Sequence, residues 1–274
     1  FPVHEIEAYH WKKNEEKLKN NKITREEFLI NYNKITGPYK LHMRLSDGRG
    51  MRKRLVNGTE MDQRKIFLPL LKKGWVCCDI GAHVGDYMIE MAIIVGSTGK
   101  VKAYEAIPHY SRLLNKSVDA NNLNNIEVKL AAVGSSNGSM SLPDSMLSGS
   151  LAKPGEIANE KLVKIPIVRL DDELKHLDAI KIDVEGYEIE VLNGMQELIN
   201  ENPNIIIFLE VHNNKLKDCG GTLPELANIL LNKFNFTIYK IGYKHCICTS
   251  KNQKLDQYKV INTIDNFATE FIDS

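Results

Sequence analysis

The sequence predicts an α/β fold with a mostly parallel sheet covered by helices on both faces. Apolar runs and amphipathic segments alternate from Gly74 onward, a pattern typical of strands joined by helical crossovers. The chain has 274 residues, of which 43% are hydrophobic, enough for one large domain with a buried core. The predicted strands are 75–80, 101–105, 126–132, 178–184, 204–211, 235–241 and 245–250. The predicted helices are 85–95, 108–121, 187–199 and 222–233. Only residues 242–244 separate the last two strands, too few for a parallel crossover, so we expect these strands to pair antiparallel.

Residues 1–37 are predicted to form a helical extension, which leaves 38–274 as the main domain. Segment 4–35 is rich in charge, and Thr24 with Glu27 matches a helix capping box. The extension could cap the domain, or it could serve in dimerisation or as a lid over a substrate. Residues 38–58 alternate around Asp47-Gly48, which predicts a hairpin.

The segment 134–173 is long for a connection inside a compact domain, and it is rich in Ser and Gly. It follows the third strand of the α/β pattern, near the expected strand tips. We therefore expect either a mobile lid or an extra hairpin at the sheet edge.

Composition narrows the classes of partner. The formal net charge of +1 provides no strong field to recruit nucleic acid or an anionic membrane. No apolar run approaches the roughly 20 residues that span a bilayer, and the first residues do not resemble a signal peptide. The five cysteines lack metal-site spacing, so we expect mostly buried thiols in a reducing, cytoplasmic setting.

A cofactor site is predicted where the first strand of the α/β pattern ends. Asp79-x-Gly81-x-x-x-Gly85 follows this strand and opens a helix, and Glu105 ends the next strand, where an acid can accept hydrogen bonds from a ribose. The spacing is not G-x-G-x-x-G, and a carboxylate before Gly81 would repel a pyrophosphate, which disfavours a NAD-dependent oxidoreductase. A carboxylate there suits an ammonium group, as in S-adenosylmethionine (SAM).

Catalytic groups are predicted at the ends of two further strands. Asp183 and Glu185 lie at the tip of one predicted strand, and Glu210 and His212 lie at the tip of another. If these two strands are neighbours in the sheet, their tips form an acidic cluster with a histidine. The candidate general bases are Asp183, Glu185 and His212. Of these, His212 has the unperturbed pKa most suitable for accepting a proton near neutral pH. Glu185 could instead complement a helix dipole, and His212 could be a loop histidine bonded to backbone. The cluster could also bind Mg²⁺, because acidic oxygens at adjacent strand tips suit a hard cation.

Four segments together resemble the FkbM family of SAM-dependent methyltransferases over roughly residues 40–250. They are DIGAHVGD at 79–86, YEAIP at 104–108, KIDVEGYE at 181–188 and LEVH at 209–212. The resemblance implies the Rossmann-like class I methyltransferase fold, whose seven strands have the order 3-2-1-4-5-7-6 with strand 7 antiparallel. It also implies O-methylation of a sugar or another small molecule, and it does not require a metal. The family usually has Asn at the position of His83.

The resemblance implies a set of cofactor contacts along the strand tips. These residues are Asp79, Gly81, Ala82, His83, Gly85, Glu105, Ala106, Ile107, Ala132 and Asp183. Asp79 should lie near the methionine amino group, and Glu105 should hold the ribose. Ala106, Ile107 and Ala132 should border the adenine. Asp183 should face the transferred methyl group.

Other functions stay open from the sequence alone. A nucleic-acid (RNA) methyltransferase on the same fold would need a basic face, for which the candidates are Arg44, Arg49, Arg52, Lys53 and Arg54. A SAM-binding module without catalysis is a further alternative. The expected partner is a small hydroxylated molecule rather than a nucleic acid or membrane, and the amphipathic N-terminal segment makes a homodimer plausible.

Overall fold

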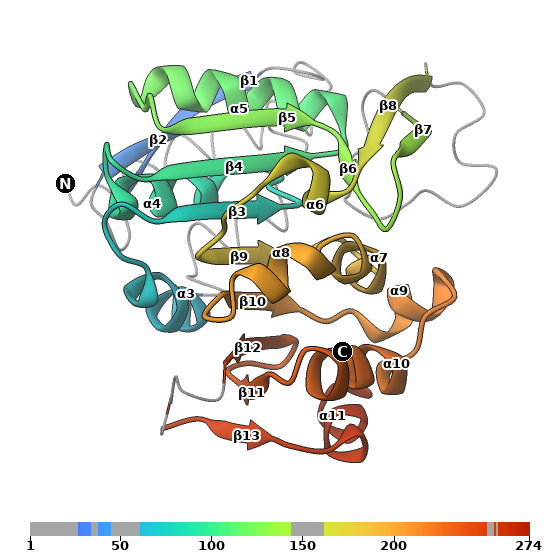
Figure 1. The fold of residues 1–274 in the computed structure, drawn as a ribbon. Coiled ribbons are helices and arrows are strands. Elements are labelled where there is room, and N and C mark those ends of the chain that lie inside the picture. Colours follow the sequence, from blue (N-terminus) through green and yellow to red (C-terminus); the bar gives the residue numbers. More distant parts are fainter. Residues whose placement is uncertain (1–26, 34–37, 45–60, 144–161, 251–254, 256) are drawn as a thin grey trace, which may run out of the picture.

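The computed structural model describes residues 27–33, 38–44, 61–143, 162–250, 255 and 257–274, and a central sheet dominates this part of the chain (Figure 1). The sheet has eight strands in the order β13-β11-β12-β10-β9-β3-β4-β5. Their bounds are β3 (Val76–Ile80), β4 (Lys100–Glu105), β5 (Ile126–Leu130), β9 (Ala179–Ile182), β10 (Ile206–Glu210), β11 (Thr237–Lys240), β12 (His245–Thr249) and β13 (Lys259–Ile261). The five strands from β10 to β5 are parallel, whereas β12 is antiparallel to both of its neighbours.

The expected α/β fold and strand order are confirmed. Numbered along the chain, the first seven strands of the sheet follow the order 3-2-1-4-5-7-6, with β12 as the antiparallel seventh strand. The number of strands differs from the prediction, because β13 adds an eighth strand at the edge, antiparallel to β11. This three-residue strand is too short to produce a clear alternating pattern in the sequence.

Helices cover both faces of the sheet, and each face has its own apolar core. On one face lie α3 (Met61–Phe67), η2 (Leu68–Leu70), α4 (Asp86–Val95) and α5 (Pro108–Ala120). On the other lie α6 (Leu170–Glu173), α7 (Glu188–Asn193), α8 (Gln196–Glu201), α9 (Asn213–Asp218), α10 (Leu223–Asn228), η3 (Ile229–Lys233) and α11 (Ile264–Phe271). The neighbours Cys77 and Cys78 belong to opposite cores, as alternation along a strand requires.

Two predicted helices are interrupted. The segment predicted as 187–199 forms α7 and α8, which are separated at Gly194. A Cβ at Gly194 would lie 2.0 Å from the carbonyl oxygen of Gly134, so the chain bends where two backbones touch. The segment predicted as 222–233 begins as α10 and ends in the π-helical turn η3.

The helical prediction for the N-terminal extension is wrong for residues 27–33. They form strand β1 (Glu27–Asn33), which pairs antiparallel with β2 (Pro38–Arg44). Glu27, expected in a helix capping box, is therefore the first residue of a strand. The run EFLINYN contains Phe, Ile and Tyr, which favour strands once a partner strand is present. Residues 1–26 and the expected second half of the hairpin, within 45–60, lie outside the described residues.

The insertion contributes a second, smaller sheet beside the carboxyl ends of the parallel strands (Figure 1). Its strands β6 (Ala132–Val133), β7 (Gly138–Pro143) and β8 (Leu162–Val168) have the order β6-β8-β7. The described part of the insertion thus contains a hairpin, β7 with β8, but this hairpin belongs to a separate sheet and does not extend the edge of the central sheet as expected. Residues 144–161 lie outside the described residues. The third predicted strand, 126–132, ends at Leu130, and Ala132 begins the second sheet.

Two further expectations concern cysteines and membranes. Cys77, Cys78, Cys246 and Cys248 are buried free thiols, whereas Cys219 is exposed. Within the described residues, every helix is too short or too polar to span a membrane.

Candidate active site

The loop between β3 and α4 depends on two glycines. Gly81 has a φ of +75°, and a Cβ there would lie 1.9 Å from the carbonyl oxygen of Asp183. Gly85 has a φ of +83°, and a Cβ there would lie 2.6 Å from a side-chain carbon of Leu114. Only glycine satisfies both the left-handed backbone and the lack of space. The loop from Gly81 to Gly85 is therefore held directly against the tip of β9.

His83 occupies a left-handed position within this loop. Its φ is +52°, a conformation in which Asn and His are enriched among residues other than glycine. This explains how histidine can stand where the FkbM resemblance leads us to expect Asn. The imidazole packs edge-on against the Tyr110 ring, with 4.3 Å between ring centroids. Ala82, the preceding residue, is buried.

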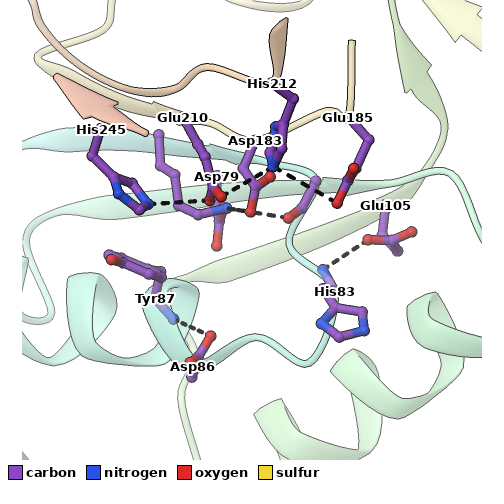
Figure 2. Close-up of polar contacts among 12 residues, drawn as sticks. Asp79, His83, Asp86, Tyr87, Glu105, Asp183, Glu185, Glu210, His212 and His245 are labelled. Carbon is purple, nitrogen blue, oxygen red and sulfur yellow. Dashed lines mark hydrogen bonds and ion pairs between the residues drawn. The ribbon is translucent and has the colours of Figure 1, made fainter. Parts of the chain in front are cut away.

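Glu105 joins the glycine loop to the start of α5. Its carboxylate accepts a hydrogen bond from the backbone N–H of His83 at 2.7 Å (Figure 2) and another from the backbone N–H of Ile107 at 2.9 Å. Burial raises the pKa of Glu105 to about 7, even though these two hydrogen bonds favour the ionised form. Each carboxylate oxygen retains a lone pair that can accept one more hydrogen bond. The residue expected to hold the ribose therefore also orders the loop.

The residues expected around the adenine lie beside Glu105 in the fold. Ala106 is half-buried and Ile107 is buried. Ala132 is also half-buried, and the backbone N–H of its neighbour Ala131 donates to the Glu105 carbonyl oxygen at 3.1 Å. The three positions thus come together at the tips of β4 and β5.

Asp79 is fully buried and pairs with a lysine that sequence reasoning missed. Lys181 lies opposite Asp79 in the parallel pairing of β3 with β9. Its Nζ lies 3.2 Å from Oδ1 of Asp79 and 3.4 Å from Oδ2 of Asp183. It also donates to the carbonyl oxygen of Gly81 at 3.2 Å. The signal was available in the sequence, because Lys181 is the only charged residue in the otherwise apolar strand AIKI.

The predicted acid–histidine cluster assembles at the tips of β9 and β10. Asp183, Glu185 and His212 each offer a ligand atom, and these atoms lie within 4.8 Å of one another. Nε2 of His212 is 3.0 Å from Oε1 of Glu210 and 3.9 Å from Oε1 of Glu185 (Figure 2). The ring's other nitrogen, Nδ1, lies 3.7 Å from Oε1 of Glu188, a residue with no exposed surface.

A second histidine, His245, also contacts this cluster. It is the first residue of β12 and lies opposite Glu210 in the antiparallel pairing with β10. Its Nε2 is 3.2 Å from Oε2 of Glu210, so Glu210 lies between two histidines (Figure 2). The sequence signal was a polar residue opening an apolar strand, but only the strand pairing identifies Glu210 as its partner.

The surrounding carboxylates change the expected role of His212. Burial alone would lower the pKa of His212, but its ion pairs with Glu188 and Glu210 and the charge of Glu185 raise that pKa to about 10. Burial would raise the pKa of Glu210, but its ion pairs with His212 and His245 lower that pKa. Burial raises the pKa of Glu185. At neutral pH His212 is therefore protonated, and a carboxylate is the better proton acceptor.

One N-terminal element supports the cofactor loop from outside the predicted site. Arg64 of α3 is buried, forms ion pairs with Asp86 and Glu90 of α4, and stacks 4.1 Å from the Tyr87 ring centroid. Asp86 directly follows Gly85, so Arg64 holds the first turn of α4 in place. No local pattern in the sequence predicts this contact, because the partners lie on separate helices.

Three comparisons with known proteins bear on identity. A SAM-dependent methyltransferase from Aquifex aeolicus is 16% identical with a TM-score of 0.42, covering 72% of this chain and 90% of its own. A SAM-dependent O-methyltransferase from Thermotoga maritima is 15% identical with a TM-score of 0.42, covering 80% and 77%. These likenesses are too distant to add to what the strand order shows, and no curated protein matches significantly. The methyltransferase FkbM domain model, however, matches residues 79–238, more than half of the chain. The chain therefore belongs to the FkbM methyltransferase domain family and is a SAM-dependent methyltransferase.

Proposed function

We propose that this enzyme transfers the methyl group of SAM to a hydroxyl group of a small molecule or sugar. The observation that carries the proposal is the contact between Gly81 and Asp183, since it joins the cofactor loop to the candidate base. A hydroxyl directed at Asp183 would thus lie beside the cofactor loop. Such alignment can supply several kcal/mol of barrier reduction.

The residues of the site fit SAM. Oδ2 of Asp79 is buried and has no hydrogen-bond donor among the described residues, which suits an ammonium group. Glu105 has acceptor capacity for ribose hydroxyls, while Ala106, Ile107 and Ala132 supply small or apolar surface beside it. When bound, SAM supplies a methyl group on a cationic sulfur that leaves as a neutral thioether.

The protein must orient the acceptor and remove its proton. The acceptor oxygen forms a bond to the methyl carbon as the carbon–sulfur bond breaks, and the hydroxyl proton passes to a carboxylate. Asp183 is our first candidate for this base, and Glu185, which is more exposed, can pass the proton to solvent. Protonated His212 would stabilise the negative charge that develops on the acceptor oxygen.

The charge of the cluster favours a neutral acceptor. The carboxylates of Glu185, Glu188 and Glu210 pair with His212. A fourth carboxylate, that of Asp183, pairs with Lys181 beside them. They would repel a phosphodiester, so we favour a sugar or another hydroxylated metabolite over RNA.

Thermal unfolding tests the cofactor first. S-adenosylhomocysteine (SAH) at about a hundred times its Kd should add about 2.7 kcal/mol to the free energy of unfolding, whereas NAD should add nothing. Transfer of labelled methyl from SAM to a panel of neutral hydroxylated molecules then tests the acceptor, with the methylated atom identified by NMR. Methylation of nitrogen, or of RNA alone, would contradict the proposal.

A further inference from the structure

A buried lysine in the centre of the sheet needs a physical explanation. Lys181 is 3% exposed and lies on β9, between β3 and β10. Burying an ammonium group is costly unless its charge and donors are matched. Replacing a whole buried ion pair by apolar residues is often neutral for stability, so stability alone does not explain a lysine here.

The contacts of Lys181 connect the cofactor loop with the candidate base. Its Nζ is within 3.4 Å of one oxygen each from Asp79, Gly81 and Asp183. Three oxygens match the three donors of an ammonium group. One side chain thus touches the strand before the loop, the loop itself, and the tip of β9.

Lys181 also affects the pKa of Asp79 and determines which of its carboxylate oxygens is engaged. Burial raises the pKa of Asp79, and the charge and hydrogen bond of Lys181 oppose that effect. Lys181 engages Oδ1 and leaves Oδ2 without a donor among the described residues. The group of Asp79, Asp183 and Lys181 contains two carboxyl groups but only one ammonium group, so it offers an oxygen to one further cation.

We propose that Lys181 is a positioning residue that presents Asp79 as the acceptor for the ammonium group of the cofactor, and so determines recognition of the methionine end. This inference rests on the proposed use of SAM. It predicts that Lys181 discriminates between ligands that share an adenosine but differ in the amino-acid end.

The test compares SAH with methylthioadenosine, which lacks the amino-acid end, by isothermal titration calorimetry. In Lys181→Met, the affinity for SAH should fall by about tenfold to a hundredfold, and that for methylthioadenosine should stay within about twofold. The control Lys102→Met removes a partly exposed lysine of β4 that pairs with Glu127, and it should change neither affinity.

A second variant covers the case in which Lys181→Met does not fold. Asp79→Asn combined with Lys181→Met removes both members of the buried pair, which is often tolerated, and it should also lose the preference for SAH. If either variant keeps the wild-type preference, or loses both ligands equally, the inference is overturned and Lys181 is structural. If the wild-type protein binds neither ligand, the proposed function itself fails.

Discussion

Nε2 of His212 lies 3.0 Å from Oε1 of Glu210, and this ion pair is almost entirely buried. The pKa of His212 is raised from 6.5 to about 10. The contribution of this ion pair to the free energy of unfolding is therefore complete below about pH 6.5 and is lost as the pH rises through 10. We expect His212→Gln to lower the free energy of unfolding by about 3 kcal/mol near pH 6, with the deficit closing toward pH 10. Guanidinium denaturation at several pH values measures this.

The exposed His176, which lies 3.1 Å from Asp178, provides the matched control for that experiment. His176→Gln should change the free energy of unfolding by less than about 1 kcal/mol at every pH. A deficit in His212→Gln that stays constant or grows with pH would contradict a protonated His212.

Asp183→Asn tests the proposed general base once an acceptor is identified. Loss of the base should lower kcat by about a hundredfold to ten-thousandfold, whereas SAH affinity should fall much less. Asp172→Asn, at an exposed acid of α6, should leave kcat unchanged. If Asp183→Asn retained near-normal turnover, Asp183 could not be the base.

Glu105→Ala should weaken SAH binding by about tenfold to a hundredfold, because it removes a ribose acceptor and the bonds that order the glycine loop. Calorimetric titration measures the loss. Glu127→Ala on the neighbouring strand β5, whose side chain is 64% exposed, should bind SAH normally. Equal affinities for Glu105→Ala and the wild-type protein would show that the ribose lies elsewhere.

Mg²⁺ should not be required. Asp183, Glu185 and His212 are close enough to share a cation, but protonated His212 has no lone pair to offer and Lys181 already neutralises one carboxylate. We expect millimolar Mg²⁺ to leave the unfolding midpoint unchanged, and EDTA to leave methyl transfer unchanged. A midpoint shift that Asp183→Asn abolishes would instead indicate a metal site.

Gly81→Ala should be far more harmful than Gly220→Ala. Both glycines have positive φ angles, so both substitutions carry a backbone cost of about 1–2 kcal/mol. Of the two, only Gly81 would place the added Cβ on a carbonyl oxygen, that of Asp183, whereas Gly220 has open space. Denaturation should show the larger loss of stability for Gly81→Ala, accompanied by loss of SAH binding. Similar losses for the two variants would mean that the loop can move away from β9.

Local sequence pattern determined the alternation of strands and helices and the positions of the cofactor loop, Glu105 and Asp183. These features depend on hydrophobic period and on residues close together in the chain, so they can be read without knowing the fold. The same local reasoning failed for residues 27–33, because an apolar stripe in a short segment fits either a helix or a strand. Hydrogen bonds from β2 decide in favour of the strand.

Only the tertiary structure decided the partners and charges within the site. Strand register places Lys181 opposite Asp79, 102 residues earlier, and His245 opposite Glu210. The sequence alone favoured His212 as the base from its unperturbed pKa. Packing among carboxylates raises that pKa, because the free energy of a charge depends on burial and on neighbouring charges that the chain brings together only when it folds.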